Sequence, residues 1–225
     1  MELHTFSITA RCDETGDFGV AVCTARPNVG SLVPFVSRRG AIATQARTNT
    51  DLGRKGLLLL EQGIDIKIAL QALLEQDSDR EIRQLHGVDA QHTFAFTGSK
   101  CVEWCGHHEG KNFTVAGNML AGAQVIEAMK QAYEEAEKQG SELSERLLRA
   151  LEAGQKVGGD KRGKQSAALL VASDNPRYYH NLRVDEHTDP VAELRRIYQV
   201  VVEHTERIRK EYGEEGLRLF SKIKY

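Results

Sequence analysis

A polar, glycine-rich loop that runs directly into an apolar strand at residues 158–171 is the feature that most constrains the fold of this chain. Its glycines, Gly158, Gly159 and Gly163, permit positive φ angles and a close approach of the backbone to a ligand. The loop residues 160–166 add charges and hydrogen-bonding groups, and residues 167–171 form a buried strand that anchors them. Because functional side chains often lie on loops held by rigid elements, we expect a binding site here. A solvated surface turn is the alternative.

Alternating hydropathy predicts the other strands. Residues 5–12 place Phe6 and Ile8 on one face and the hydroxyls of Thr5, Ser7 and Thr9 on the other, which indicates a half-buried strand. The turn chemistry of residues 13–17 predicts a hairpin to a second strand. Strands are predicted over residues 18–25, 40–46, 83–89, 92–98, 111–117 and 178–184.

Two pairs of amphipathic helices separate these strands. The first pair begins at an N-cap of Thr50 or Asp51, ends its first helix at Gly63 and caps its second with Asp65. The second pair covers about 125–136 and a helix capped by Ser141 and ended by Gly154. A last helix, about 189–213, opens with an aspartate followed by a proline.

This element order predicts an α+β fold with sheets in the middle and helix pairs outside. With 225 residues and 40% hydrophobic content, the chain can form one domain over residues 1–225, and no linker divides it.

The net charge and the length of the apolar runs limit the kinds of partner that the chain can have. The 30 Lys and Arg residues nearly balance 32 Asp and Glu residues, so no net field favours nucleic acid or an acidic membrane. No apolar run is long enough to span a bilayer, and the start lacks the pattern of a signal peptide. We therefore expect a cytoplasmic protein whose four cysteines are free thiols.

Residues 101–108 hold ligand types that zinc prefers, namely Cys101, Cys105, His107 and His108. Their spacing is poor, because structural sites usually show two close pairs separated by a longer loop, and adjacent histidines cannot easily turn to one ion. We predict that these cysteines bind no metal and that the protein needs no cofactor. The loop at 158–163 also lacks the order of a phosphate-binding P-loop, although Lys161, Arg162 and Lys164 could hold a carboxylate or phosphate.

Several segments together resemble the DUF1028 family. They are residues 5–8, 19–22, 40–46 and 117–120 and, most specifically, GGDKRGKQSAA at 158–168. The resemblance runs from Thr5 to about Arg196. It implies membership of the N-terminal-nucleophile (Ntn) hydrolase superfamily and hence a four-layer αββα sandwich with two central antiparallel sheets. It also implies hydrolysis of a small, non-peptide amide by the first residue of the mature chain.

The family's threonine falls on Thr5. A threonine at a free terminus carries its own base, because the α-amine has a pKa of about 8 and lies beside the hydroxyl. On this reading Thr5, Asn118 and Ser166 are catalytic. The predicted substrate-binding residues are Gln45, Asn49, Asp160, Arg162 and Gln165. Donors among Gln45, Asn49, Asn118 and Ser166 would hold the oxyanion, and Asp160 and Arg162 would line the same cavity as Thr5.

The start of the chain departs from this scheme. Residues 1–4 precede Thr5, and a bulky acidic residue after Met1 disfavours routine methionine removal. Either the chain is cleaved between His4 and Thr5, or it keeps the fold without the chemistry and acts as a small-molecule-binding or assembly protein. In both cases we expect a small-molecule partner and a homo-oligomer, most simply a dimer, because the helices carry more apolar surface than one layer hides.

Overall fold

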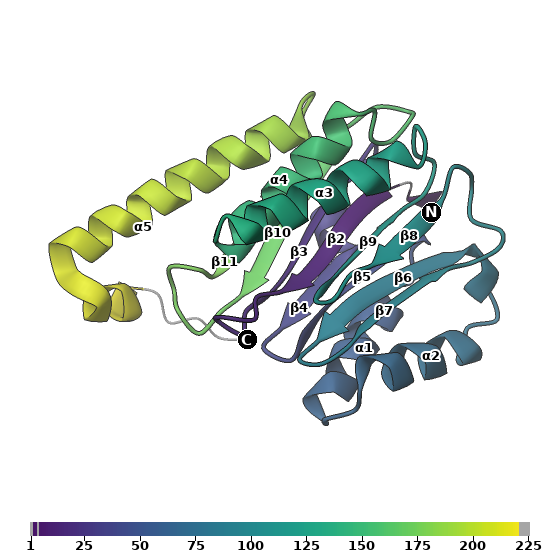
Figure 1. The fold of residues 1–225 in the computed structure, drawn as a ribbon, viewed down its shortest axis with the longest axis horizontal. Coiled ribbons are helices and arrows are strands. Elements are labelled where there is room, and N and C mark those ends of the chain that lie inside the picture. Colours follow the sequence, from purple (N-terminus) through teal and green to yellow (C-terminus); the bar gives the residue numbers. More distant parts are fainter. Residues whose placement is uncertain (1, 4, 221–225) are drawn as a thin grey trace.

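The computed structural model describes residues 2–3 and 5–220, and it confirms an α+β fold with two antiparallel sheets (Figure 1). The larger sheet has six strands in the order β11-β10-β3-β2-β9-β8. Its strands are β2 (Thr5–Arg11), β3 (Phe18–Thr24), β8 (Gly106–Glu109), β9 (Phe113–Gly117), β10 (Ser166–Ala172) and β11 (His180–Val184).

The smaller sheet has five described strands, ordered β1-β5-β6-β7 with β4 also paired to β5. Its strands are β1 (Glu2–Leu3), β4 (Pro34–Ser37), β5 (Gly40–Arg47), β6 (Arg83–Asp89) and β7 (Thr93–Thr97). The chain therefore passes from the smaller sheet to the larger one between Leu3 and Thr5.

Helices cover the outer face of each sheet. The α-helices are α1 (Thr50–Glu61), α2 (Ile66–Gln76), α3 (Gln124–Lys138), α4 (Leu143–Lys156) and α5 (Pro190–Phe220). One apolar core joins α1 and α2 to the smaller sheet, and another joins α3, α4 and the start of α5 to the larger sheet. A third core, which includes Val20, Val22 and Ala43, lies between the sheets.

Strand β2 shows how the alternation of the sequence is used. Phe6, Ile8 and Ala10 belong to the core beneath α3 and α4. Ser7 and Thr9 point the other way, because side chains alternate along a strand, and they are fully buried between the sheets. The predicted hydroxyl face is therefore internal.

Two helix starts differ from the prediction. Helix α1 is capped by Asn49, whose side chain accepts from the Asp51 amide, because the chain turns into the helix one residue earlier than expected. Helix α4 begins after Glu142, which makes no side-chain capping hydrogen bond, and it continues past Gly154 to Lys156. Ser141 is therefore not the cap; its carbonyl instead accepts from Arg146. The predicted Asp65 cap of α2 is confirmed.

Three strands were missed, of which β1 has only two residues. Strand β4 follows an irregular segment, and β8 lies in the segment considered for zinc. Both are four residues long and lie beside longer strands, β5 and β9, whose edges they extend. Strands of this length carry too little alternation to predict.

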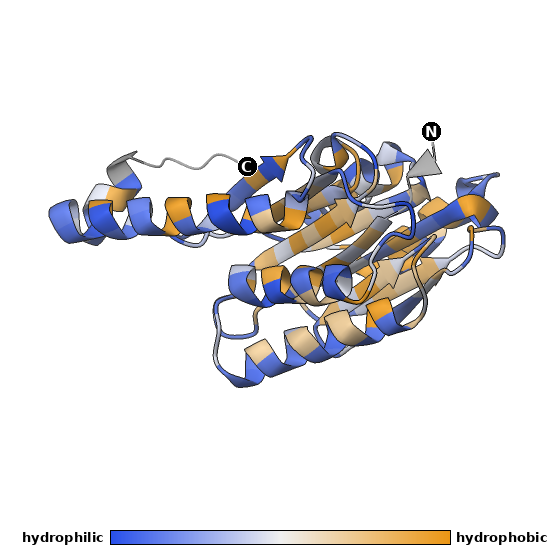
Figure 2. Ribbon diagram, turned by 90° about the horizontal axis from the view of Figure 1, so that it is seen from above, coloured by the Kyte–Doolittle hydropathy of each residue, from blue (hydrophilic) through white to orange (hydrophobic). Residues whose placement is uncertain are grey.

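Helix α5 extends well beyond the rest of the molecule (Figures 1 and 2). The predicted stop at Gly213 corresponds to a break with φ 71°, after which the chain becomes helical again to Phe220. Near its start, Leu194 and Tyr198 are buried in the core over the larger sheet. No helix in the described part of the chain is both long and apolar enough to cross a membrane.

His180 is a buried imidazole beneath α5. It is 2% exposed, its ring lies edge-on to Tyr198 with centroids 5.2 Å apart, and neither ring nitrogen has a hydrogen-bond partner among the described residues. Burial lowers the pKa of His180 to about 4. Such a ring stays neutral in the folded protein while the unfolded chain takes up a proton at a pKa of about 6.5.

We therefore predict that the free energy of unfolding falls as the pH drops from about 6.5 to about 4, with a slope of about 1.4 kcal/mol per pH unit from His180. A His180→Phe variant should reduce this slope by about 1.4 kcal/mol per pH unit, the contribution of one proton. At pH 7.5 it should be as stable as the wild type or more stable. The reason is that it removes a buried polar group without partners. Urea unfolding at several pH values measures both quantities. An unchanged slope in the variant would contradict the assignment.

Candidate functional site

One end of the molecule gathers most of the predicted site residues. In the larger sheet, Thr5 lies opposite Thr24 and Thr24 lies opposite Ser166, so these three side chains share a face. Asn118 follows β9 at the same end, and its backbone N–H donates to the Thr5 carbonyl at 3.0 Å. We refer to this region as the Thr5 end.

Thr5 and Asn118 each present a polar atom without a partner. Thr5 is fully buried, and its Oγ1 has no hydrogen-bond partner among the described residues. Asn118 is also fully buried and donates its Nδ2 to Gln84 Oε1 at 3.0 Å, while its Oδ1 remains without a donor in the same described part. Buried polar atoms without partners are rare, so each is an atom to which a ligand or a changed chain terminus could bind.

Gln84 of β6 holds the surrounding side chains in place. Its Nε2 lies 3.0 and 2.9 Å from the carbonyl oxygens of Gly106 and Gly117, which can only accept. Its Oε1 must therefore accept, and it does so from Gln45 Nε2 at 2.7 Å and from Asn118. Two predicted site residues are thus fixed by a glutamine that the sequence analysis did not select.

The network continues along the inner face of β2. Ser7 Oγ donates to Gln45 Oε1 at 2.6 Å and lies 2.8 Å from His86 Nε2. His86 Nδ1 lies 2.8 Å from Thr114 Oγ1, which lies 2.6 Å from Thr9 Oγ1. The expectation that this face meets polar partners is correct for Ser7 and Thr9. Their partners come from β5, β6 and β9, however, and not from the loop at 158–166 as we expected.

The direction of each hydrogen bond follows from Gln84. Because Ser7 donates to Gln45, His86 must donate to Ser7 through Nε2–H, so its Nδ1 must accept from Thr114. Burial lowers the pKa of His86 to about 3, which keeps the ring neutral as this order requires. The network is therefore satisfied up to Asn118 Oδ1 and Thr5.

A cavity of about 250 Å³ opens beside Asn118. Ala46, Arg47, Lys100 and Cys101 also line it, and the lining has no acidic side chain among those that the structure describes. Strand β1 borders this region, since Leu3 pairs with Ala46 and Glu2 pairs with Arg47. The site is thus a basic cavity at the edge where the first residues of the chain join β5.

Ala46 has a backbone conformation that is unusual for a residue with a side chain. Its φ is 67°, in the left-handed region that L-residues other than glycine seldom adopt. Strained residues of this kind cluster at functional sites. Its position in the cavity wall, next to the residue paired with Glu2, marks this backbone as part of the candidate site.

The loop at 158–166 serves mainly to fix the chain. Asp160 is buried, and its carboxylate accepts from the Ala25 amide at 3.1 Å and from the Arg162 guanidinium at 3.1 and 2.7 Å. Its backbone forms a bridge with Leu120, and the Lys161 amide donates to the Met119 carbonyl. Asp160 and Arg162 therefore bind each other. We had expected both to line the cavity beside Thr5, but neither lines the basic cavity.

The other predicted residues are also held by local structure. Ser166 Oγ donates to the Arg26 carbonyl and accepts from the Val29 amide at 3.1 Å, so its hydroxyl is committed to the 26–29 turn. Gln165 makes backbone hydrogen bonds to Thr24 and His187. Asn49 caps α1 and donates to Asp77 Oδ2 at 3.1 Å. Of the predicted site, only Thr5, Gln45 and Asn118 meet through one network.

Cys101 and Cys105 use their thiols differently from zinc ligands. Cys101 donates to the Arg83 carbonyl at 3.2 Å, and Cys105 donates to the Cys101 carbonyl at 3.5 Å. Burial raises the pKa of Cys101 to about 11, which disfavours the thiolate that binds metal. That they bind no zinc remains a prediction.

Sequence reasoning missed Gln84, His86, Arg47 and Lys100. A signal for the first two exists, because polar residues at 84 and 86 alternate with Leu85 and Gly87, as they do in a strand with a buried polar face. The two cations come from separate segments and carry no local signal. Only the fold brings them to one cavity.

Comparison with known proteins identifies the family. The family model described as "Family of unknown function (DUF1028)" matches residues 5–194, and the chain belongs to this family. Among solved structures, the crystal structure of a DUF1028 protein from Silicibacter pomeroyi superposes with a TM-score of 0.77 at 34% identity, covering 88% of this chain and 88% of that one. A search of curated proteins gives no match.

The central position of Gln84 leads to a stability prediction. Gln84→Ala should lower the free energy of unfolding by about 3 kcal/mol or more, because it leaves two buried amide donors and two carbonyls unpaired at about 1–3 kcal/mol each. Gln71→Ala, on the exposed face of α2, is the matched control and should change it by less than about 0.5 kcal/mol. Urea denaturation of both variants measures the difference; equal small effects would show that the network does not stabilise the fold.

Proposed function

We propose that this protein is an Ntn-type amidohydrolase built on a four-layer αββα sandwich, with Thr5 as its nucleophile after residues 1–4 are removed. The observation that carries the proposal is the buried Thr5 Oγ1 without a partner at the start of a central strand, next to Asn118, whose Oδ1 also lacks one. Helix pairs outside two antiparallel sheets support the sandwich. The family match, which begins at Thr5, supports the choice of residue.

The chemistry follows from a free Thr5 amine. The neutral α-amine takes the proton of the hydroxyl as Oγ1 attacks the amide carbonyl, and it then returns a proton to the departing amine. The resulting acyl-threonine is hydrolysed by water, with the α-amine again acting as base. No second residue needs to supply the base.

Asn118 fits a second role besides that of the oxyanion donor predicted from the sequence. Its Nδ2 donates one of its two hydrogens to Gln84, and its Oδ1, which has no partner among the described residues, can only accept. In the proposed enzyme Oδ1 orients the α-amine or the hydroxyl of Thr5. Gln45 likewise donates one of its two Nε2 hydrogens to Gln84 and helps to hold Asn118 through that residue.

Backbone amides of β5 can also hold the oxyanion in this proposal. Removal of residues 1–4 takes away β1, which pairs with Ala46 and Arg47, and so uncovers the end of β5 at the cavity. Backbone N–H groups aimed at a developing oxyanion are worth about 100-fold or more in rate. The positive φ of Ala46 orients this backbone within the cavity wall.

The lining of the cavity indicates the kind of substrate. Arg47 and Lys100 are the charged residues of the described lining, and both are cations, which favours an amide that also carries a carboxylate or another anionic group. The cavity volume of about 250 Å³ suits a small molecule. Arg162, which binds Asp160, is less suited to this role than the sequence indicated.

We predict that Thr5→Ala abolishes hydrolysis of small anionic amides. The test compares chains that begin Met-Thr5, whose methionine is readily removed, with and without the substitution. Activity should fall by several orders of magnitude in Thr5→Ala, and Ser7→Ala should only weaken it, because Ser7 supports the network without reacting. Intact mass establishes whether the amine of Thr5 is free in each sample. Undiminished hydrolysis by Thr5→Ala would exclude the nucleophile role.

A second candidate is a binding protein that keeps the fold without the chemistry. It is favoured by the pairing of Glu2 and Leu3 with β5, which shows that the residues before Thr5 fit the edge of the smaller sheet. An intact His4–Thr5 bond in protein taken from its own cells, together with saturable binding of small anions, would favour this reading over the enzyme.

A further inference from the structure

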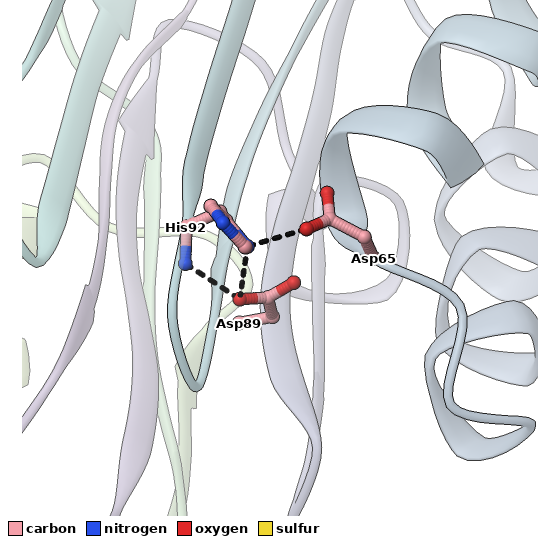
Figure 3. Close-up of side chains that lie close together, drawn as sticks. All are labelled: Asp65, Asp89 and His92. Carbon is pink, nitrogen blue, oxygen red and sulfur yellow. Dashed lines mark hydrogen bonds and ion pairs between the residues drawn. The ribbon is translucent and has the colours of Figure 1, made fainter.

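A second cluster of chemically capable side chains lies at the opposite end of the sandwich from Thr5. Asp65, Asp89 and His92 each offer one ligand atom, and these atoms all lie within 4.8 Å of one another (Figure 3). Strand β6 runs from Arg83 beside the Thr5 end to Asp89 here, about 20 Å away at 3.3 Å per residue. The cluster is therefore independent of the proposed active site.

Three separate pieces of the fold bring the cluster together. Asp65 caps α2, Asp89 ends β6, and His92 lies in the turn just before β7. Backbone amides hold the two carboxylates: Asp65 Oδ1 accepts from Lys67 at 2.7 Å, and Asp89 Oδ2 accepts from Ile66 at 2.8 Å. Asp89 Oδ1 accepts from the amides of Gln91 and His92, each at 2.7 Å. These amides orient the carboxylates, and because each carboxylate oxygen can accept twice, Asp65 and Asp89 Oδ2 keep lone pairs that a metal ion could use.

The local charge is unbalanced. The Asp65 and Asp89 side chains are 25% and 12% exposed and face one imidazole, whose Nδ1 pairs with Asp65 Oδ2 and lies 3.7 Å from Asp89 Oδ1. A histidine compensates a carboxylate only when it is protonated, and one proton cannot balance two carboxylates. Arg39 lines the adjoining cavity but forms no ion pair with either carboxylate within the described residues.

We propose that Asp65, Asp89 and His92 bind a divalent transition-metal ion of the zinc type. One imidazole and two carboxylates are a mixed nitrogen and oxygen set, which suits zinc better than magnesium or calcium. A cavity of about 220 Å³ that all three residues line leaves room for a further ligand such as water. With metal–ligand distances of about 2.0–2.2 Å, the ligand atoms of Asp65 and His92 would lie about 3.3 Å apart, so binding needs only a small movement of the two side chains.

The ion would tie two parts of the smaller sheet's layer together. Asp65 belongs to the connection between α1 and α2, whereas Asp89 and His92 belong to the β6–β7 hairpin. Binding to the folded state alone raises stability by mass action, so metal should stabilise the protein whether or not Thr5 is catalytic. From the sequence we expected no metal, and the candidate ligands there were the cysteines and adjacent histidines at 101–108.

The test is a zinc titration of full-length protein treated with EDTA and dialysed. We expect one zinc ion per chain by calorimetry, and a rise in Tm of about 5–10 °C at a zinc concentration about 100 times Kd. Asp65→Asn keeps an N-cap for α2, because asparagine caps as well as aspartate, but it removes a charged ligand. This variant and His92→Ala should each lose more than about 100-fold in affinity, since loss of even an outer-shell partner costs 10–100-fold.

Two control variants identify the site. His204→Ala, on the exposed face of α5, should bind zinc as the wild type does. Cys105→Ala should also bind zinc normally, because Cys105 belongs to the competing cysteine and histidine segment at 101–108 and not to the proposed site. Three results would each overturn the proposal: failure of the wild type to bind zinc, wild-type affinity in Asp65→Asn and His92→Ala, or loss of binding in Cys105→Ala.

Discussion

The fold depends on a buried amide, that of Gln84, which joins the two sheets at one end. It accepts from Gln45 of its own sheet and from Asn118 beside the other, and it donates to carbonyls of Gly106 and Gly117. Burying so many polar groups is tolerable only when nearly all are paired. Because the carbonyls can only accept, this one residue determines the direction of the hydrogen bonds from Asn118 to Thr9.

The hydrogen-bond network around Gln84 also bears on the function. A polar network that is satisfied almost everywhere makes the exceptions informative, and the exceptions here are Thr5 Oγ1 and Asn118 Oδ1. Both lie where residues 2–3 pair with the end of β5, beside a cavity with Arg47 and Lys100. The interior of the molecule thus holds Thr5, the proposed nucleophile, in place, and the short strand β1 precedes it at the edge of β5.

The loop at 158–166 has a supporting role. The Asp160–Arg162 pair and the Ser166 hydroxyl hold the ends of β3 and the 26–29 turn, which border Thr24 and therefore Thr5. A specific sequence motif can accordingly reflect the need to position a site as much as the need to bind a substrate. The opposite end carries the Asp65–Asp89–His92 cluster, whose members are likewise oriented by backbone amides.

The sequence by itself determined the α+β class, most strands, both helix pairs and the family, because alternation, capping residues and a glycine-rich motif are local signals. It also indicated that Thr5, Ser7 and Thr9 share a face. Only the tertiary structure decided which groups meet that face, since Gln45, His86 and Thr114 are brought there by pairing between distant segments. For the same reason Arg47 joins Lys100, and Asp65 joins His92, only when the sheets assemble: hydrogen bonds and charges between segments depend on register and packing, which no short window of residues contains.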